Sequence, residues 1–228
     1  MMTKDADWCV LFDWDGVVVD SSKLHEQSWE VMAAEYGLTL PEGHFIRGFG
    51  MKNERVIPEV LGWTDDPEKI QFYAQRKEAV YRELALAAGL GPLPGVREIL
   101  QALQAAGVPC SIASSTPRVN IDFILGRMGL DVYFDAITTG DQVQHGKPAP
   151  DIFLHAAGQL GGRPALVFED ALVGIEAGKR AGMAVVAVTT THPAHELGTA
   201  DLVVNRLDEL SLEEARRLAL VAAGRPVD

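Results

Sequence analysis

Four groups of polar side chains in the sequence could carry chemistry. In chain order they are Asp13 with Asp15, Ser114 with Ser115, Lys147, and Glu169 with Asp170. Paired carboxylates are suitable ligands for a hard cation such as Mg²⁺, which prefers carboxylate oxygens together with water and substrate phosphate. Hydroxyl groups and a lysine ammonium can hold the oxygens of a phosphate group. These residue types therefore favour a site for a divalent cation and a phosphorylated ligand.

Each group also has an ordinary structural explanation when it is taken alone. Asp15 and Gly16 can form a solvated turn, and Ser114 can cap a helix. Lys147 can be a solvated surface lysine, and the acidic pair can supply negative charge at a helix N-terminus. The two interpretations differ in whether the four groups lie at one common edge of a sheet.

Short and nearly continuous apolar runs precede three of these groups and recur later in the chain. Such runs are typical of strands that are covered on both faces, as in a parallel sheet. The predicted strands are residues 8–12, 109–113, 165–168, 184–188 and 201–204. Amphipathic helical patterns alternate with them, at residues 95–106, 119–128, 151–159 and 172–181. This alternation predicts an α/β fold with a doubly wound parallel sheet, which binds ligands at the carboxyl ends of its strands.

One long segment interrupts the alternation with helical patterns only. Residues 24–36 and 67–88 have helical periodicity, and no convincing strand pattern occurs between residues 21 and 90. The Gly-Pro-Leu-Pro-Gly sequence that follows is typical of a hinge. We therefore expect a core made of residues 1–20 and 92–228, with a closing helix at 210–223. A helical domain is expected to be inserted at residues 21–91.

The composition excludes several classes of protein. The chain has 228 residues, 47% of them hydrophobic, and a net charge of −12. It has no basic cluster, so we expect neither nucleic acid nor a membrane surface as a partner. No segment has the ~20 apolar residues of a membrane helix, and no signal peptide is evident, so a cytoplasmic protein is expected. Cys9 and Cys110 lie in apolar runs and are expected to be buried thiols.

Taken together and in order, the four groups resemble the motifs of the haloacid dehalogenase superfamily of phosphotransferases. The resemblance covers essentially the whole chain. It includes the Asp-x-Asp-Gly-Val sequence that begins at Asp13 and the Gly-Lys-Pro-x-Pro-Asp sequence that contains Lys147. It implies a Rossmann-like core with a helical cap inserted after the first strand. Closest in pattern is the subgroup that contains β-phosphoglucomutase and many small-molecule phosphatases.

The resemblance also implies a Mg²⁺-dependent reaction that passes through an aspartyl-phosphate. It makes Asp13 the nucleophile and Asp15 the general acid and base. Ser114 and Lys147 would neutralise the phosphoryl oxygens as charge develops. The implied ligands of the Mg²⁺ ion are Asp13, the backbone carbonyl of Asp15, Asp170, and Glu169 directly or through water.

The same motif argues against two kinds of relative. Haloacid dehalogenases lack the second aspartate of the motif. Phosphonatases replace it and use a cap lysine for a Schiff base, close to the position of Lys52 here. The presence of Asp15 therefore implies a phosphate ester as substrate, and we expect a phosphatase of a small phosphorylated metabolite.

The inserted domain is expected to determine the substrate. His25 and Lys77 lie where β-phosphoglucomutase has its cap histidine and lysine, so a phosphosugar mutase is the alternative. Met51 or Lys52 replaces the phosphate-binding arginine of that mutase, and Ala171 replaces its serine, which favours hydrolysis. The candidate substrate-binding residues are His25, Arg47, Lys52, Lys77 and Ser115.

Three further expectations complete the prediction. Residues 50–54 resemble a loop of plant plastid phosphatases that act on a ribityl-amino-pyrimidine in riboflavin synthesis. A non-catalytic regulator with the same fold is a third hypothesis, because fold alone does not establish activity. A monomer is expected, with a homodimer as the alternative.

Overall fold

The structure is a computed structural model, and it describes residues 6–227 of the chain. The chain divides into two compact units, Met1–Asp20 with Gly91–Asp228, and Ser21–Leu90. We call the first unit the core, since it contains the sheet, and the second unit the helical insert. The predicted first domain begins and ends with residues 1–5 and 228, which lie outside the described part.

A six-stranded parallel sheet in the order β3-β2-β1-β4-β5-β6 forms the centre of the core. Its strands are β1 (Cys9–Phe12), β2 (Cys110–Ser114), β3 (Ala136–Thr139), β4 (Ala165–Glu169), β5 (Ala184–Val188) and β6 (Leu202–Val204). Every residue of the four central strands is buried, as expected of apolar strands that helices cover on both faces. The doubly wound parallel sheet is therefore confirmed.

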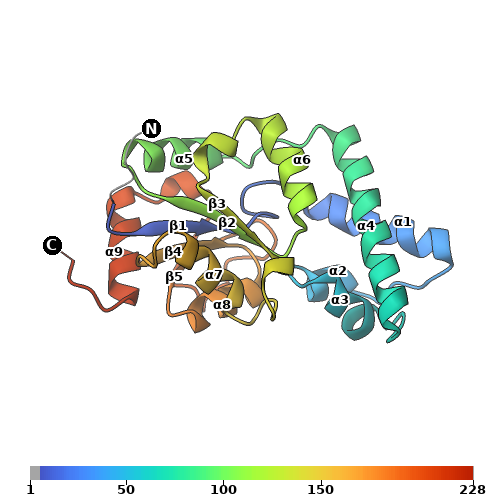
Figure 1. Cartoon of the computed structure of the whole chain (residues 1–228). Coiled ribbons are helices and arrows are strands. Elements are labelled where there is room, and N and C mark those ends of the chain that lie inside the picture. Colours follow the sequence, from blue (N-terminus) through green and yellow to red (C-terminus); the bar gives the residue numbers. More distant parts are fainter. Residues whose placement is uncertain (1–5, 228) are drawn as a thin grey trace. The chain divides into compact units, whose positions relative to one another are not determined.

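Helices cover both faces of the sheet (Figure 1). α5 (Val96–Ala105) and α6 (Arg118–Met128) lie over one face, and α7 (Asp151–Gln159) and α8 (Leu172–Arg180) lie over the other. α9 (Leu212–Ala222) packs against β4 and β5. No helix within residues 6–227 has both the length and the apolar character that crossing a membrane requires.

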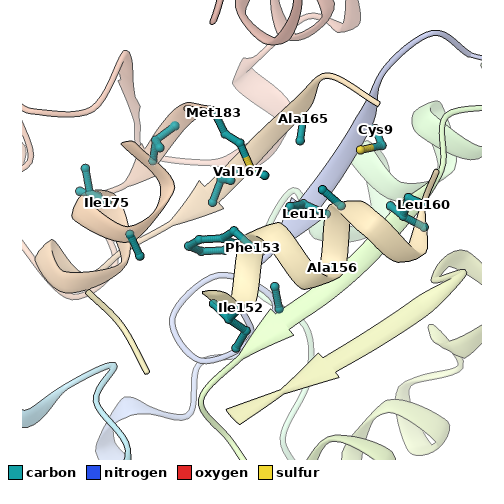
Figure 2. Close-up of a cluster of buried hydrophobic side chains, with 14 of the residues drawn as sticks. Cys9, Leu11, Ile152, Phe153, Ala156, Leu160, Ala165, Val167, Ile175 and Met183 are labelled. Carbon is teal, nitrogen blue, oxygen red and sulfur yellow. The ribbon is translucent and has the colours of Figure 1, made fainter. Parts of the chain in front are cut away.

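One face of the sheet packs against α7 and α8 through a continuous apolar cluster (Figure 2). Cys9 and Leu11 of β1 both belong to it, because alternate residues of a strand point to the same face. Phe153 of α7 and Ile175 of α8 belong to the same cluster, and both side chains are buried. Cys9 and Cys110 are buried free thiols, as predicted.

The described residues of the insert form helices and connecting loops. They contain α1 (Ser22–Tyr36), α2 (His44–Gly48), α3 (Asn53–Arg55), a π-helix (Val56–Leu61) and α4 (Pro67–Ala88). Asp66 caps α4 by accepting a hydrogen bond from the Glu68 N–H at 3.0 Å, and Pro67 occupies a first-turn position that needs no N–H. Trp29 of α1 packs edge-on against Trp63, with 5.6 Å between ring centroids.

Several short elements of the structure have no clear signal in the sequence. β3 is a four-residue strand at the edge of the sheet, and its first two residues are only half-buried. A short edge strand of this kind has neither a long apolar run nor a regular alternation. In the insert, Gly50 and Pro58 interrupt the periodicity around α2, α3 and the π-helix.

Two glycines in helices of the core should respond oppositely to substitution by alanine. A Cβ atom on Gly178 of α8 would lie 2.6 Å from Cγ2 of the buried Val185, so Gly178→Ala should lower the free energy of unfolding by about 1–3 kcal/mol. A Cβ on the exposed Gly126 of α6 would meet nothing within 4 Å, so Gly126→Ala should raise it by up to about 1 kcal/mol. Denaturant unfolding measures both changes, and equal effects would contradict the packing of α8 against β5.

Candidate active site

The carboxyl ends of β1 and β4 lie side by side near the middle of the sheet. β1 pairs with β2 on one side and with β4 on the other. The chain runs from β1 toward one edge of the sheet and from β4 toward the opposite edge. Ligands of open α/β sheets bind outside the strand ends where the winding reverses in this way. Asp13 directly follows β1 and Glu169 ends β4, so both lie at the reversal point.

The register of these two strands brings the acidic residues together. Phe12 is paired with Phe168, and the Asp13 N–H donates to the Phe168 carbonyl oxygen at 3.0 Å. The two phenylalanine rings also pack together, with centroids 5.2 Å apart. The apolar strands therefore fix the position of Asp13 next to Glu169.

A tight turn after β1 brings the chain close to Asp170. Gly16 has a φ of +78°, and its N–H donates to the Val19 carbonyl oxygen at 2.9 Å. A Cβ atom on Gly16 would overlap the Asp170 carboxylate. Glycine is therefore required here both for its left-handed backbone and for the space that it leaves.

Lys147 connects the loop after β3 to both strand ends. Its Nζ lies 2.8 Å from Oδ1 of Asp13 and 2.5 Å from Oε1 of Glu169. All three side chains are buried. The predicted neighbourhood of Lys147, Asp13 and Glu169 is therefore present, and Lys147 is a buried ion-pair partner rather than a solvated surface lysine.

Burial and charge strongly perturb this cluster. Burial raises the pKa of Asp13 from its ordinary 3.8 to about 7, and the charges of Glu169 and Asp15 add to the rise while Lys147 opposes it. Burial alone would lower the pKa of Lys147, but the charges of Asp13 and Glu169 hold it above its ordinary 10.5. Lys147 is thus a permanent cation, whereas Asp13 titrates near neutral pH.

Both oxygens of Glu169 are already engaged. Oε1 accepts from Lys147, and Oε2 accepts from the backbone N–H groups of Asp170 and Ala171 at 2.8 and 2.9 Å. A Cβ atom on Gly174, in the first turn of α8, would overlap this carboxylate. The start of α8 therefore holds Glu169 in one orientation, aimed at Lys147.

Asp170 is arranged differently, and it makes the cluster suitable for a cation. Its side chain is fully buried, and Oδ1 has no hydrogen-bond partner among residues 6–227, whereas Oδ2 accepts a hydrogen bond from the Thr191 hydroxyl. One oxygen each from Asp13, Glu169 and Asp170 lie within 4.8 Å of one another. Burial raises the pKa of Asp170 well above 3.8, and the charges of Glu169 and Asp13 add to the rise. The donor set fits a hard divalent cation, whose charge would relieve this cost.

The hydroxyl groups after β2 lie at the next strand end. Ser114 ends β2, is buried, and accepts a hydrogen bond from the Thr116 N–H at 3.1 Å. Ser115 is half-buried beside it. The Thr116 hydroxyl donates to Oδ2 of Asp15, so it connects this loop to the turn after β1.

His25 and Lys77, which were predicted to bind substrate because they match residues of the mutase, lie close together in the insert. Nζ of Lys77 on α4 is 2.6 Å from Nδ1 of His25 on α1, and it also donates to Oε1 of Glu78 at 2.9 Å. Asn53 donates to the same Glu78 oxygen at 2.7 Å. Burial alone would raise the pKa of Glu78, but Lys77, His25 and Asn53 hold it below its ordinary 4.5. The ring of Tyr81 stacks on His25 at 3.9 Å.

The other two predicted substrate residues of the insert occupy less buried positions. Arg47 is exposed on α2, and Lys52 is half-buried directly before α3.

Thr116 and Thr191 each donate a hydrogen bond to a candidate site carboxylate. Thr191 was not a candidate from the sequence, and the hydroxyl of Thr116 was expected with those of Ser114 and Ser115 to hold a phosphate oxygen, not Asp15. Thr116 adjoins the serine pair, and Thr191 ends a run of three threonines that directly follows β5. The useful signal is that both follow strand ends of the same sheet. In the insert, the pairing of Lys77 with its neighbour Glu78 could be expected from the sequence, whereas the contact of Asn53 with Glu78 could not, because it depends on the packing of α3 against α4.

The fold and the site define a doubly wound α/β protein whose winding reversal carries a buried carboxylate–lysine cluster. The chain belongs to the haloacid dehalogenase-like hydrolase family, whose sequence model matches residues 9–182.

Three curated relatives show the range of named activities. The chain is 38% identical to a chloroplastic 5-amino-6-(5-phospho-D-ribitylamino)uracil phosphatase of Arabidopsis thaliana, over 92% of this chain and 57% of that protein. It is 33% identical to a phosphorylated carbohydrates phosphatase of Thermotoga maritima, over 76% and 81% of the two chains. It is also 33% identical to a β-phosphoglucomutase of Mycobacterium bovis, over 88% and 90%. The chain thus spans little more than half the length of the Arabidopsis relative.

The raised pKa of Asp170 predicts a pH-dependent gain in stability for Asp170→Asn without added metal. Because the folded protein keeps a proton there that the unfolded chain releases above about 3.8, the free energy of unfolding falls as pH rises through the folded pKa. The variant lacks this penalty, so its melting temperature should exceed that of the wild type at about pH 8 and approach it at about pH 5. Asp131→Asn, at an exposed position, is the control. Lower stability of Asp170→Asn at both pH values would contradict the argument.

Proposed function

We propose that this protein is a Mg²⁺-dependent phosphatase that hydrolyses a small phosphorylated metabolite through an aspartyl-phosphate on Asp13. The observation that carries the proposal is the position of Lys147 between Asp13 and Glu169, in a cluster where one oxygen each from Asp13, Glu169 and Asp170 lie within 4.8 Å of one another. In the proposed reaction, the carboxylate of Asp13 is the nucleophile, Lys147 is a fixed cation and Asp170 is a metal ligand, all at the carboxyl ends of the central strands.

In the first half of the proposed reaction, a carboxylate oxygen of Asp13 attacks phosphorus. A bond forms between this oxygen and phosphorus, and the bond between phosphorus and the alcohol oxygen of the substrate breaks. Asp15 in its protonated form gives its proton to the departing alcohol oxygen. Lys147, already within hydrogen-bond distance of Asp13, neutralises charge on the phosphoryl group, and Ser114 binds another of its oxygens.

In the second half, water releases the phosphate. Asp15, now ionised, takes a proton from the water whose oxygen attacks phosphorus, and the bond to Asp13 breaks. The Thr116 hydroxyl, bonded to Oδ2 of Asp15, would hold this carboxylate in position between the two steps. Inorganic phosphate leaves, and Asp13 is free for another cycle.

The proposed metal ligands are Asp13, the backbone carbonyl of Asp15, and Asp170. Glu169, whose two oxygens are both engaged, would act through water and by orienting Lys147. A bound Mg²⁺ ion would supply positive charge to the phosphoryl oxygens and offset the repulsion between carboxylates and a phosphate dianion.

Similarity to named phosphatases supports the substrate class. The relative with the 38% match acts on 5-amino-6-(5-phospho-D-ribitylamino)uracil by its name, and this compound is therefore the first substrate to test. The Thermotoga relative suggests sugar phosphates as the second group. Ala171, where the mutase subgroup has a serine, further favours hydrolysis. The cytoplasmic location and monomeric state expected from the sequence stay predictions.

A β-phosphoglucomutase-like mutase is the alternative, and one observation favours it. His25 and Lys77 form a close buried pair at the positions that suggested a mutase cap, and a named mutase is 33% identical. A mutase would keep its aspartyl-phosphate until a sugar phosphate accepts the group. A phosphoenzyme that hydrolyses rapidly without any acceptor would exclude this alternative.

The proposal predicts that Asp13→Asn abolishes phosphate release. The amide is a poor nucleophile, so turnover should fall by more than about 10³-fold in the presence of Mg²⁺. The assay measures phosphate release from the ribitylamino-uracil phosphate, sugar phosphates and phosphoglycolate, with and without Mg²⁺. Asp122→Asn, at an exposed position of α6, should leave turnover unchanged. Wild-type turnover by Asp13→Asn would rule out the aspartyl-phosphate route.

We propose that four residues of the insert bind the part of the substrate remote from phosphorus: His25, Arg47, Lys52 and Lys77. Ser115, directly after β2, is proposed as a further substrate-binding residue. Lys77→Met keeps the length and apolar stem of the side chain but removes its charge. Loss of a hydrogen bond from a charged group should raise KM by roughly 10-fold, with a smaller change in kcat.

The neighbouring residue provides the matched control for this variant. Arg76 pairs with Glu35 on the surface of α4 and α1, so Arg76→Met should leave KM unchanged. An unchanged KM for Lys77→Met, or an equal rise for Arg76→Met, would remove Lys77 from the proposed substrate site.

A further inference from the structure

The two oxygens of the Asp170 carboxylate lie in different surroundings. Oδ2 accepts a hydrogen bond from the Thr191 hydroxyl, whereas Oδ1 is buried with no hydrogen-bond partner in the described part of the chain. A carboxylate can rotate about its last side-chain bond, so nothing in Asp170 alone decides which oxygen remains available. The hydrogen bond from Thr191 makes that choice.

Hydrogen bonds on both sides of Thr191 hold the loop that carries it. Before it, the Thr189 N–H donates to the Val204 carbonyl oxygen at 3.1 Å, a backbone contact that does not depend on the Thr189 side chain. After it, the buried His192 ring is hydrogen-bonded to Glu196 at 2.9 Å. The Thr191 hydroxyl is therefore presented by an anchored segment.

Gly16 limits the movement of the carboxylate from the other side. A Cβ atom at Gly16 would overlap Oδ2 of Asp170 and would lie 3.1 Å from the Thr191 hydroxyl oxygen. Oδ2 is thus enclosed between the turn after β1 and the loop after β5. This enclosure leaves Oδ1 as the oxygen that a ligand can use.

We propose that Thr191 is a positioning residue that selects Oδ1 of Asp170 as a ligand for the divalent cation. This inference rests on the proposed function, because it concerns the same cation. Hydrogen-bond partners of metal-binding carboxylates orient the ligand, and their loss typically weakens metal binding by about 10–100-fold. Without the hydroxyl, the Asp170 carboxylate samples other rotations, and the preorganised set of oxygens is lost.

The test measures Mn²⁺ binding directly, without turnover, by the electron paramagnetic resonance signal of free Mn²⁺. Thr191→Val removes the hydroxyl at nearly constant volume and should raise the Mn²⁺ dissociation constant by about 10-fold or more. Thr191→Ser restores a hydroxyl and should bind Mn²⁺ within about 3-fold of the wild type. Thermal unfolding establishes that the variants are folded, and Thr191→Ala replaces Thr191→Val if the latter is not.

A control in the same loop separates positioning from loop damage. Thr189→Val removes a hydroxyl that binds Asn205 instead of a carboxylate, and it should leave the Mn²⁺ dissociation constant unchanged. Equal weakening by Thr189→Val and Thr191→Val would overturn the inference, as would wild-type binding by Thr191→Val.

Asp170→Asn distinguishes failure of this inference from failure of the proposed function. Loss of Mn²⁺ binding in Asp170→Asn together with wild-type binding in Thr191→Val would overturn the role of Thr191 alone. Absence of Mn²⁺ binding to the wild-type protein would overturn both the inference and the proposed metal site.

Discussion

The rest of the site depends on the buried contact of Lys147 with Asp13 and Glu169. Three buried carboxylates and one ammonium carry net negative charge when all are ionised, and ions are costly to bury unless partners satisfy them. Lys147 offsets part of this charge, the amides before α8 hold Glu169, and Thr191 holds Asp170. These contacts do not compensate all of the negative charge: one oxygen of Asp170 has no hydrogen-bond donor among the described residues, and the pKa of Asp13 is still raised. This imbalance is the physical reason to expect a cation in the cluster.

The fold determines where the carboxylates of this cluster lie. Two parallel strands in register put Asp13 beside Glu169, at the winding reversal where open α/β sheets generally bind their ligands. Gly16 and Gly174 lie where any side chain would displace a carboxylate. The acidic site therefore depends on glycines that carry no chemistry themselves. A preorganised set of charges of this kind can stabilise a phosphoryl group without rearranging during the reaction.

Much of this arrangement could be predicted from the sequence, and the rest follows from packing that no local pattern records. The apolar runs ending at Phe12 and Phe168 correctly predicted strands. The resemblance to a known family implied a common site for Asp13, Lys147 and Glu169, and the structure brings these three side chains together. Strand β3 was not predicted, because a short, half-buried edge strand lacks a long apolar run. The hydrogen bonds of Thr116 to Asp15 and of Thr191 to Asp170 were not predicted. Their partners are about 100 and about 20 residues apart in sequence, so only the assembled sheet brings them together.

The central claim is that Asp13 becomes covalently phosphorylated during turnover. The most direct measurement is acid quenching during turnover of a substrate, followed by mass spectrometry of peptides from the protein. We expect one added phosphoryl group on the peptide containing Asp13, absent from Asp13→Asn and lost within the turnover time after substrate is exhausted. Turnover of the substrate with unmodified Asp13 at every quench time, or with phosphate on another residue, would contradict it.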